Sequence, residues 1–239
     1  MMVWGVSCRQ DRRAILMTRV HQVARSWRGG GQSAMIPIVN VGYASTNYYV
    51  LGSSTTRLLI DVGWPGTLPT LMATLRRTGI PLQDIGYLLV THYHPDHAGL
   101  AQELKARDVR LIVLEPQLPA IPRLKTFMKP GTPYVDITLH DNLQLAIDGS
   151  RAFLASIGIA GAIISTPGHS DDSITLILDE GSAFTGDLPP PTLVDTEARA
   201  TVSRSWNTIR SLKATMIYPG HGPARLLPSV TESRSRTEE

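Results

Sequence analysis

The chain has 239 residues, of which 42% are hydrophobic and 18% are charged, so it can fill one core of ordinary size. Its single cysteine, Cys8, excludes an intramolecular disulfide and a cysteine-rich zinc site. No stretch reaches the roughly 18 consecutive apolar residues of a membrane span. We therefore predict a soluble, cytoplasmic protein with no membrane partner.

Positive charge is concentrated near the N-terminus. Residues 1–34 contain six arginines and one acid and carry a net charge of +5. Because the whole chain has a net charge of +3, residues 35–239 carry a net charge of −2. A mildly acidic domain offers no basic surface for nucleic acid, and we predict no nucleic-acid partner. The Arg-rich segment could target an organelle, but Met35 stands directly before the first predicted strand, so we favour a poorly ordered extension.

The remaining chain divides into a catalytic domain at 35–228 and a polar, disordered tail at 229–239. In the first half, short apolar runs bounded by turn residues predict strands at 36–41, 46–51, 57–61, 87–90 and 109–114. Apolar residues at helical spacing predict helices at 67–78 and 98–107. This alternation indicates a mixed sheet with helices packed outside it.

The second half begins with residues 115–134, which contain five prolines and cannot form one regular element. Further strands are predicted at 137–139, 143–147, 162–165, 174–178, 182–185 and 215–218. A helix is predicted at 196–212. By themselves these patterns indicate only a mixture of α and β structure.

Histidine and aspartate cluster in four of the predicted loops. Three of the seven histidines of the chain and one carboxylate follow the strand at 87–90, and further candidates follow glycine in three later loops. The seven candidate metal ligands are His92, His94, Asp96, His97, His169, Asp187 and His221. Imidazole and carboxylate suit zinc, and also iron or manganese, and seven such groups suffice for two metals.

The spacing inside the first loop suggests how it works. His92 and His94 alternate by two, so in extended backbone both point to one side and Tyr93 points elsewhere. Asp96 and His97 follow the turn at Pro95 and can reach a second point. We call residues 91–97 the metal loop. Asp61 is expected to hold the metal loop through hydrogen bonds.

Four other residues are given no direct role. His21 and His140 lie outside any motif, and Asp171 and Asp172 are interpreted as acids in a turn.

These motifs, in this order, resemble the metallo-β-lactamase-fold hydrolase superfamily over about residues 35–228. The resemblance implies an α/β (α+β) fold, a four-layer αββα sandwich. It implies that the first metal is held by His92, His94 and His169. It further implies that Asp96, His97 and His221 hold the second metal, and that Asp187 bridges the two.

The ligand set predicts a hydrolase with two Zn²⁺ as cofactors. A hydroxide bridging the two metals would attack the carbonyl of a small ester, lactone or thioester, and Asp96 would orient it and return its proton to the leaving group. Segments 115–134 and 188–195 could form the rim of the substrate pocket, with an apolar wall from Trp64, Phe127 and Met128. The partner is thus a small-molecule substrate; the oligomeric state stays open.

Differences between this chain and particular families of the superfamily narrow the range of expected substrates. The β-lactamases that use a cysteine ligand do not fit, because Cys8 lies outside the domain, and others lack the bridging aspartate, so only weak β-lactam hydrolysis is expected. Type II glyoxalases append a helical domain, and only 18 residues follow His221. Acyl-homoserine lactonases carry a tyrosine shortly after the bridging aspartate, where this chain has Leu188 and three prolines.

Two other activities stay open at this stage. A persulfide-dioxygenase-type oxidoreductase would use one iron at His92, His94 and His169. A small-molecule phosphodiesterase would use the same two metals, although the domain lacks a basic surface. A non-catalytic binding or scaffold role is disfavoured because the chain keeps every ligand.

Overall fold

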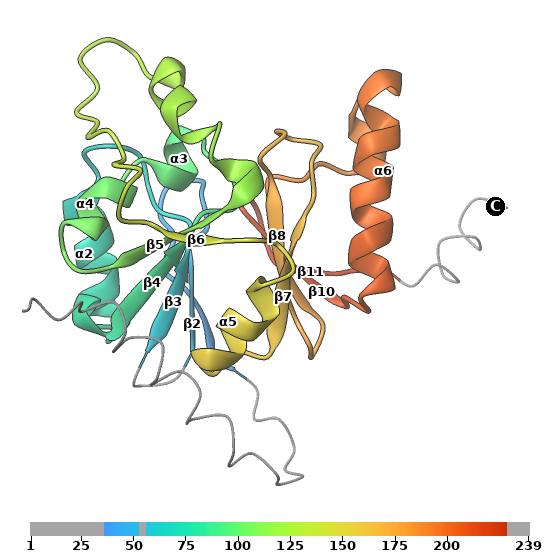
Figure 1. The fold of residues 1–239 in the computed structure, drawn as a ribbon, viewed down its shortest axis with the longest axis horizontal. Coiled ribbons are helices and arrows are strands. Elements are labelled where there is room, and N and C mark those ends of the chain that lie inside the picture. Colours follow the sequence, from blue (N-terminus) through green and yellow to red (C-terminus); the bar gives the residue numbers. More distant parts are fainter. Residues whose placement is uncertain (1–35, 53–55, 229–239) are drawn as a thin grey trace, which may run out of the picture. The chain divides into compact units, whose positions relative to one another are not determined.

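The apolar runs of the chain form two sheets that pack face to face. The structure is a computed structural model that describes residues 36–52 and 56–228. The predictions for the segment 1–34 and the tail 229–239 fall outside the described residues. Helices cover the outer face of each sheet, so the domain is the expected four-layer αββα sandwich of the α/β class (Figure 1).

The first sheet is mixed, with strand order β1-β2-β3-β4-β5-β6. β1 to β3 are antiparallel, whereas β3 to β6 run parallel. The strands are β1 (Ile38–Asn40), β2 (Tyr49–Gly52), β3 (Arg57–Ile60), β4 (Ile85–Leu89), β5 (Arg110–Leu114) and β6 (Leu143–Leu145).

The second sheet has strand order β11-β10-β9-β8-β7. β7, β8 and β9 form an antiparallel meander, β10 runs parallel to β9, and β11 is antiparallel to β10. The strands are β7 (Gly161–Ser165), β8 (Ile174–Leu178), β9 (Ser182–Gly186), β10 (Met216–Pro219) and β11 (Arg225–Leu226).

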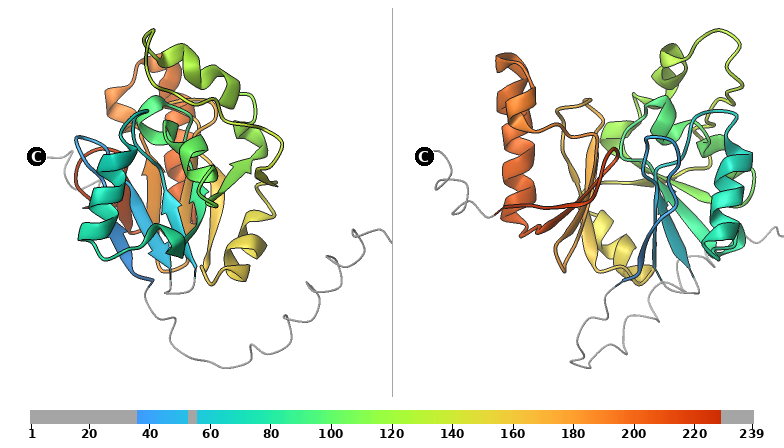
Figure 2. Two further views of the ribbon diagram at one scale, coloured as in Figure 1. Left: turned by 90° about the vertical axis from the view of Figure 1, so that its left-hand side faces the viewer. Right: turned by 180° about the vertical axis from the view of Figure 1, so that it is seen from behind.

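Three apolar clusters hold these layers together. The first buries α2 (Leu68–Arg77) and α4 (Ala101–Lys105) against the outer face of the first sheet, and the third buries α6 (Thr196–Ser211) against the second sheet. The central cluster joins the facing sides of both sheets and includes Leu154 of α5 (Ser150–Ser156). Figure 2 shows α2 and α6 on opposite sides of the paired sheets.

The helix predicted at 98–107 is two shorter helices. α3 (Pro95–Ala98) begins inside the metal loop because Pro95 occupies its first turn, where the missing N–H costs nothing. α3 is capped by Gly99, where a Cβ would collide with Pro65 and with backbone oxygens, and α4 begins at Ala101.

The strand predicted at 137–139 is wrong. Within the described residues this segment joins neither sheet, because side chains hold its backbone instead: Gln102 accepts from the Thr138 N–H at 2.9 Å, and Lys105 donates to the Thr138 carbonyl at 2.8 Å. The sequence pattern also missed α5 and β11, which are too short for a periodic signal. Segment 115–134 is irregular as predicted, with 3-10 turns at Glu115–Gln117 and Ile121–Phe127.

The topology places the candidate ligands at one end of the sandwich. β3 and β4 are parallel neighbours, as are β9 and β10, so within each pair the carboxyl ends lie at the same edge. β7 points the same way as β9, because each is antiparallel to β8. The segments that follow these five strands carry Asp61, the metal loop, His169, Asp187 and His221.

Among the described residues, no helix has the length and apolar character needed to cross a lipid bilayer.

Phe184→Ala tests the contact between the sheets. Phe184 is buried and lies against the rings of Tyr49 and Tyr218, with centroids 5.3 and 5.0 Å away. Removing the ring leaves a cavity, so we expect the free energy of unfolding in denaturant to fall by about 3–5 kcal/mol. Leu193→Ala, at a side chain that is 77% exposed, is the control and should change it by less than about 0.5 kcal/mol.

Candidate metal centre

All seven predicted ligands lie together at the carboxyl ends of the strands. They form three overlapping groups, and within each group one nitrogen or oxygen atom per residue lies within 4.8 Å of the others. The groups are His92/His94/His169, His92/His97/Asp187 and Asp96/His97/His221. Segments far apart in the chain therefore converge on one small region.

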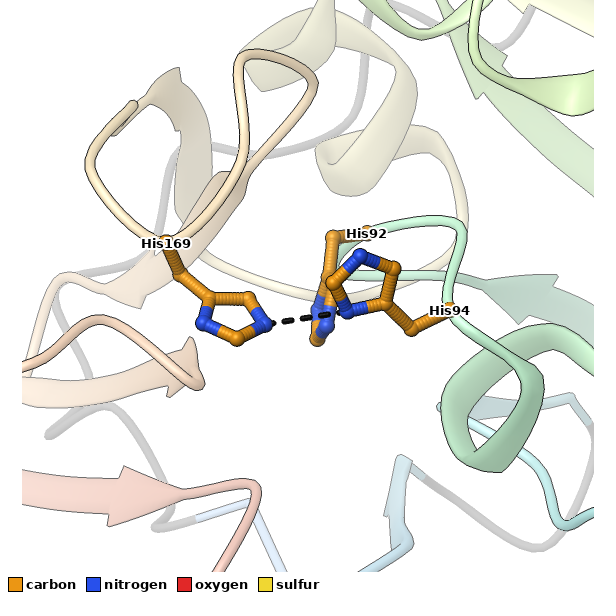
Figure 3. Close-up of side chains that lie close together, drawn as sticks. All are labelled: His92, His94 and His169. Atoms are coloured by element: carbon orange, nitrogen blue, oxygen red, sulfur yellow. Dashed lines mark hydrogen bonds between the residues drawn. The ribbon is translucent and has the colours of Figure 1, made fainter. Parts of the chain in front are cut away.

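The first group joins the two sheets. His92 and His94 follow β4, and His169 follows β7, and their three rings converge in Figure 3. His169 Nε2 lies 3.0 Å from His94 Nδ1, so either a proton or a cation is required between the two nitrogens. Ligands about 2.1 Å from a tetrahedral zinc are about 3.4 Å apart, so this spacing is near that of a metal site.

The second group lies beside the first. Asp96 Oδ2 is 3.5 Å from His97 Nε2 and 3.3 Å from His221 Nε2. Thr46, from the β1–β2 connection, donates its hydroxyl to the same Asp96 oxygen at 3.2 Å. These separations again match the edges of a metal coordination sphere.

Asp187 stands between the two groups. Its Oδ1 is 3.4 Å from His97 Nε2, whereas its Oδ2 is 3.3 Å from His221 Nε2 and 3.7 Å from His169 Nε2. One carboxylate thus faces nitrogens of both groups. This is the position that a ligand shared by two metals requires.

Three of the converging atoms are buried without a hydrogen-bond partner. Within the described residues, these atoms are His92 Nε2, His97 Nε2 and Asp187 Oδ1. A buried polar atom left unpaired costs roughly 1–3 kcal/mol, and three of them in one cluster call for a common partner. Divalent cations held by these groups would satisfy all three atoms, so the side chains fit a metal site.

Neighbouring groups orient the imidazoles for this role. The Asp61 carboxylate lies 2.9 Å from His97 Nδ1, and the Ser45 carbonyl lies 2.7 Å from His221 Nδ1. Both oxygens act as acceptors here, so each Nδ1 donates and each Nε2 is left facing the cluster as the nitrogen that can bind a metal. The Thr91 hydroxyl donates to Asp61 and lies 3.2 Å from His92 Nδ1. The hydrogen-bonded network around Asp61 therefore reaches a third imidazole.

The charges around the cluster favour a cation. Burial lowers the pKa of His92 well below its usual value, and the nearby histidines lower it further. Burial acts on His97 in the same direction, but Asp61 and Asp187 outweigh it and raise the pKa of His97 to about 10. The carboxylates therefore favour positive charge at His97 Nε2, which a metal ion would supply in place of a proton.

Asp61 holds the metal loop, as predicted. Its carboxylate is buried and accepts from the Thr91 N–H at 2.7 Å and the Thr91 hydroxyl at 2.8 Å, besides His97. Its backbone has φ 61°, a left-handed conformation that aspartate tolerates better than most residues. This strained turn at the end of β3 aims the carboxylate under the loop.

Two glycines allow the loops to approach each other. Gly186, with φ 52°, directly precedes Asp187, and a Cβ there would lie 2.8 Å from the Cβ of Thr91. Gly220 directly precedes His221, and a Cβ there would collide with Asp187 Oδ1 and His97 Cε1. The geometry of the centre thus requires glycine before Asp187 and before His221, because any Cβ there would collide with neighbouring atoms.

Some residues around the centre gave no signal in the sequence. Ser45 and Thr46 lie in an ordinary turn, and only the fold brings them to His221 and Asp96. Thr91 could have been suspected from its place at the end of a strand beside His92. Of the two remaining histidines, His140 is exposed and belongs to none of the three groups, and His21 lies outside the described residues.

A family model for the metallo-beta-lactamase superfamily matches residues 41–221. The chain belongs to the metallo-beta-lactamase superfamily. Among curated proteins, the Beta-lactamase-like protein 2 homolog of Caenorhabditis elegans is 32% identical over 184 residues, which cover 74% of this chain and 56% of that protein. Thioesterase pkgB of Emericella nidulans is 31% identical over 183 residues, covering 76% of this chain and 47% of that protein.

The Atrochrysone carboxyl ACP thioesterase of Aspergillus fumigatus is 31% identical over 189 residues, covering 77% of this chain and 39% of that protein. The chain spans about half the length of the curated relatives it matches. Among solved structures, a metallo-beta-lactamase family protein of Thermus thermophilus aligns with a TM-score of 0.62 at 21% identity, over 80% of this chain and 74% of that one. At this identity the structural match concerns the superfamily fold alone.

Gly220→Ala tests the steric requirement at the centre. The added methyl would displace Asp187 or His97, so we expect zinc affinity, measured by competition with a chromophoric chelator, to fall roughly tenfold to a hundredfold. Gly149→Ala is the control, since its Cβ would meet only the Ala146 carbonyl oxygen at an ordinary 3.5 Å. Unchanged zinc affinity in Gly220→Ala would contradict the proposed arrangement of ligands.

Proposed function

We propose that this chain is a binuclear zinc-dependent hydrolase of a small ester, lactone or thioester. The observation that carries the proposal is the convergence of seven imidazole and carboxylate groups with three buried atoms that lack partners among the described residues. His92, His94 and His169 would hold one ion, and Asp96, His97 and His221 the other. Asp187 would contact both.

Two divalent ions at these side chains would supply Lewis acidity toward a carbonyl oxygen and lower the pKa of a water toward about 7. The chain's own contribution is to place a proton acceptor beside that water. Asp96 is partly exposed, and Thr46 fixes its Oδ2 through the hydroxyl. This carboxylate would orient the attacking water and pass its proton to the leaving oxygen or sulfur.

Two clefts, each of about 380 Å³, flank the centre and suit a small substrate. The first cleft reaches from His94 and His169 to Phe127 and Arg123 in the 115–134 segment. The Phe127 ring lies 4.7 Å from that of His94 between centroids and is 55% exposed. Phe127 would thus offer the substrate an apolar contact beside His94.

The second cleft lies beside Asp187 and His221, and its wall includes Leu188, Pro189 and Pro190. Arg225 also lines this cleft and adds a positive charge. The 188–195 segment therefore contributes to the substrate rim from its first three residues. Trp64 and Met128 line neither cleft: Met128 packs against the first core cluster, and Trp64 is 47% exposed. Of the three predicted wall residues, only Phe127 lines one of these two clefts.

Relatives named as thioesterases support the carbonyl chemistry. The fungal proteins that resemble this chain at 31% identity carry that name, and a thioester is cleaved by the same attack on a carbonyl carbon as an ester or lactone. This similarity favours acyl substrates over phosphodiesters. Zinc is the metal we propose because imidazole and carboxylate are common zinc ligands; iron and manganese accept the same ligands, so the metal analysis below decides between them.

Metal content and one substitution test the proposal together. Elemental mass spectrometry of the purified chain should find about two zinc ions per chain, whereas one iron would indicate the oxidoreductase instead.

Asp96→Ala should lower kcat/KM for a 4-nitrophenyl ester or a thioester at least about a hundredfold, because the proton acceptor and one ligand are lost. His140→Ala removes an exposed imidazole outside the centre and should match wild type; equal activity of Asp96→Ala would refute the mechanism.

Phe127→Ala tests the apolar contact in the first cleft. The ring would contact substrate without holding metal, so its loss should weaken binding of the substrate and of the transition state equally. We therefore expect KM for a 4-nitrophenyl ester to rise roughly tenfold with zinc content unchanged. Leu193→Ala, an exposed apolar residue that lines neither cleft, should leave KM unchanged. A fall in zinc content in Phe127→Ala would mean that the ring instead supports His94.

A further inference from the structure

We propose that Asp172 is a positioning residue for the first group (His92, His94 and His169), acting on the backbone at Tyr93, whereas the other buried aspartate, Asp61, acts at Thr91 and His97. The inference rests on the metal binding of the proposed function but not on its substrate. The sequence suggested only a turn acid at this position, because Asp172 follows His169 in an ordinary polar turn.

The Asp172 carboxylate reaches across to the other sheet. Its side chain is buried, with 5% of the residue exposed, and its Oδ2 accepts from the Tyr93 N–H at 2.7 Å. Tyr93 stands between His92 and His94 in the chain. A charge-assisted hydrogen bond at this amide therefore acts midway between two candidate ligands.

The same turn carries the third ligand of that group. His169 precedes Asp172 by three residues, and the Ile174 N–H donates to the Thr91 carbonyl at 2.9 Å. Gln117, which is fully buried, donates to the Val90 carbonyl at 2.8 Å and to the Asp172 carbonyl at 3.4 Å. These bonds tie the end of β4 to the turn between β7 and β8, and so set the 3.0 Å approach of His94 and His169.

The second group has a different set of supports. Asp61 contacts His97 directly, Thr46 contacts Asp96, and the Ser45 carbonyl contacts His221. None of these contacts involves Asp172. Loss of the Asp172 carboxylate should therefore shift His92 and His94 relative to His169 while the second group stays in place.

The neighbouring Asp171 provides a matched control. It is exposed, and in the part of the chain that the structure describes its carboxylate makes no hydrogen bond or ion pair, although both aspartates border the first cleft. Asp171→Ala thus removes the same charge from the same turn without touching the metal loop. Its zinc affinity should equal that of wild type.

The test measures zinc binding in two backgrounds, using the full chain stripped with a chelator and titrated against a chromophoric competitor. In His221→Ala, the first group remains to bind zinc, and adding Asp172→Ala should weaken that binding roughly tenfold to a hundredfold. In His169→Ala, the second group remains, and adding Asp172→Ala should change affinity less than about threefold. Equal weakening in both backgrounds, or none in either, overturns the proposal.

Two further measurements separate positioning from folding and from the proposed function. Asp172→Asn keeps an oxygen acceptor and the residue's shape, so its zinc affinity should fall less than that of Asp172→Ala. Hydrogen exchange of the Tyr93 amide in metal-free protein should be about tenfold faster in Asp172→Ala than in Asp171→Ala. Equal exchange refutes the role of Asp172, whereas a wild-type chain that binds no zinc refutes the proposed function instead.

Discussion

The centre depends on one electrostatic constraint: buried imidazole and carboxylate atoms that face each other need a shared positive charge. His92 Nε2, His97 Nε2 and Asp187 Oδ1 are buried with no hydrogen-bond partner among the described residues. The carboxylates Asp61 and Asp187 raise the pKa of His97, although burial opposes this. Such an arrangement is costly unless a cation compensates it, so the local structure is organised around an ion.

The surrounding fold turns that constraint into a defined geometry. Parallel strand pairs in each sheet bring their carboxyl ends to one edge, and the face-to-face packing of the sheets brings the two edges together. Glycines at 186 and 220 let the ligand loops approach closely, and buried carboxylates hold the loop backbone. The rigid core thus supplies much of the organisation that a metal site needs before binding.

Membership of the superfamily describes the scaffold, and under the proposed function the walls of the two clefts would select the substrate. The ligand set is suited to attack on a carbonyl in general. The side chains that would select a substrate come from segments 115–134 and 188–195, which are irregular and lie outside the sheets. Proteins named as beta-lactamase-like and as thioesterases resemble this chain to a similar degree, at 32% and 31% identity.

The sequence by itself indicated the seven candidate ligands, the role of Asp61 and the position of most strands, because these depend on local spacing and on apolar runs. It misplaced the strand at 137–139, where the side chains of Gln102 and Lys105 replace a sheet ladder, and it missed α5 and β11. It could not reveal the contacts of Thr46, Ser45 or Asp172, nor separate Phe127 from Trp64 and Met128 as a cleft residue. Those contacts join segments up to 176 residues apart, and only the packing of the two sheets brings such segments within hydrogen-bonding distance.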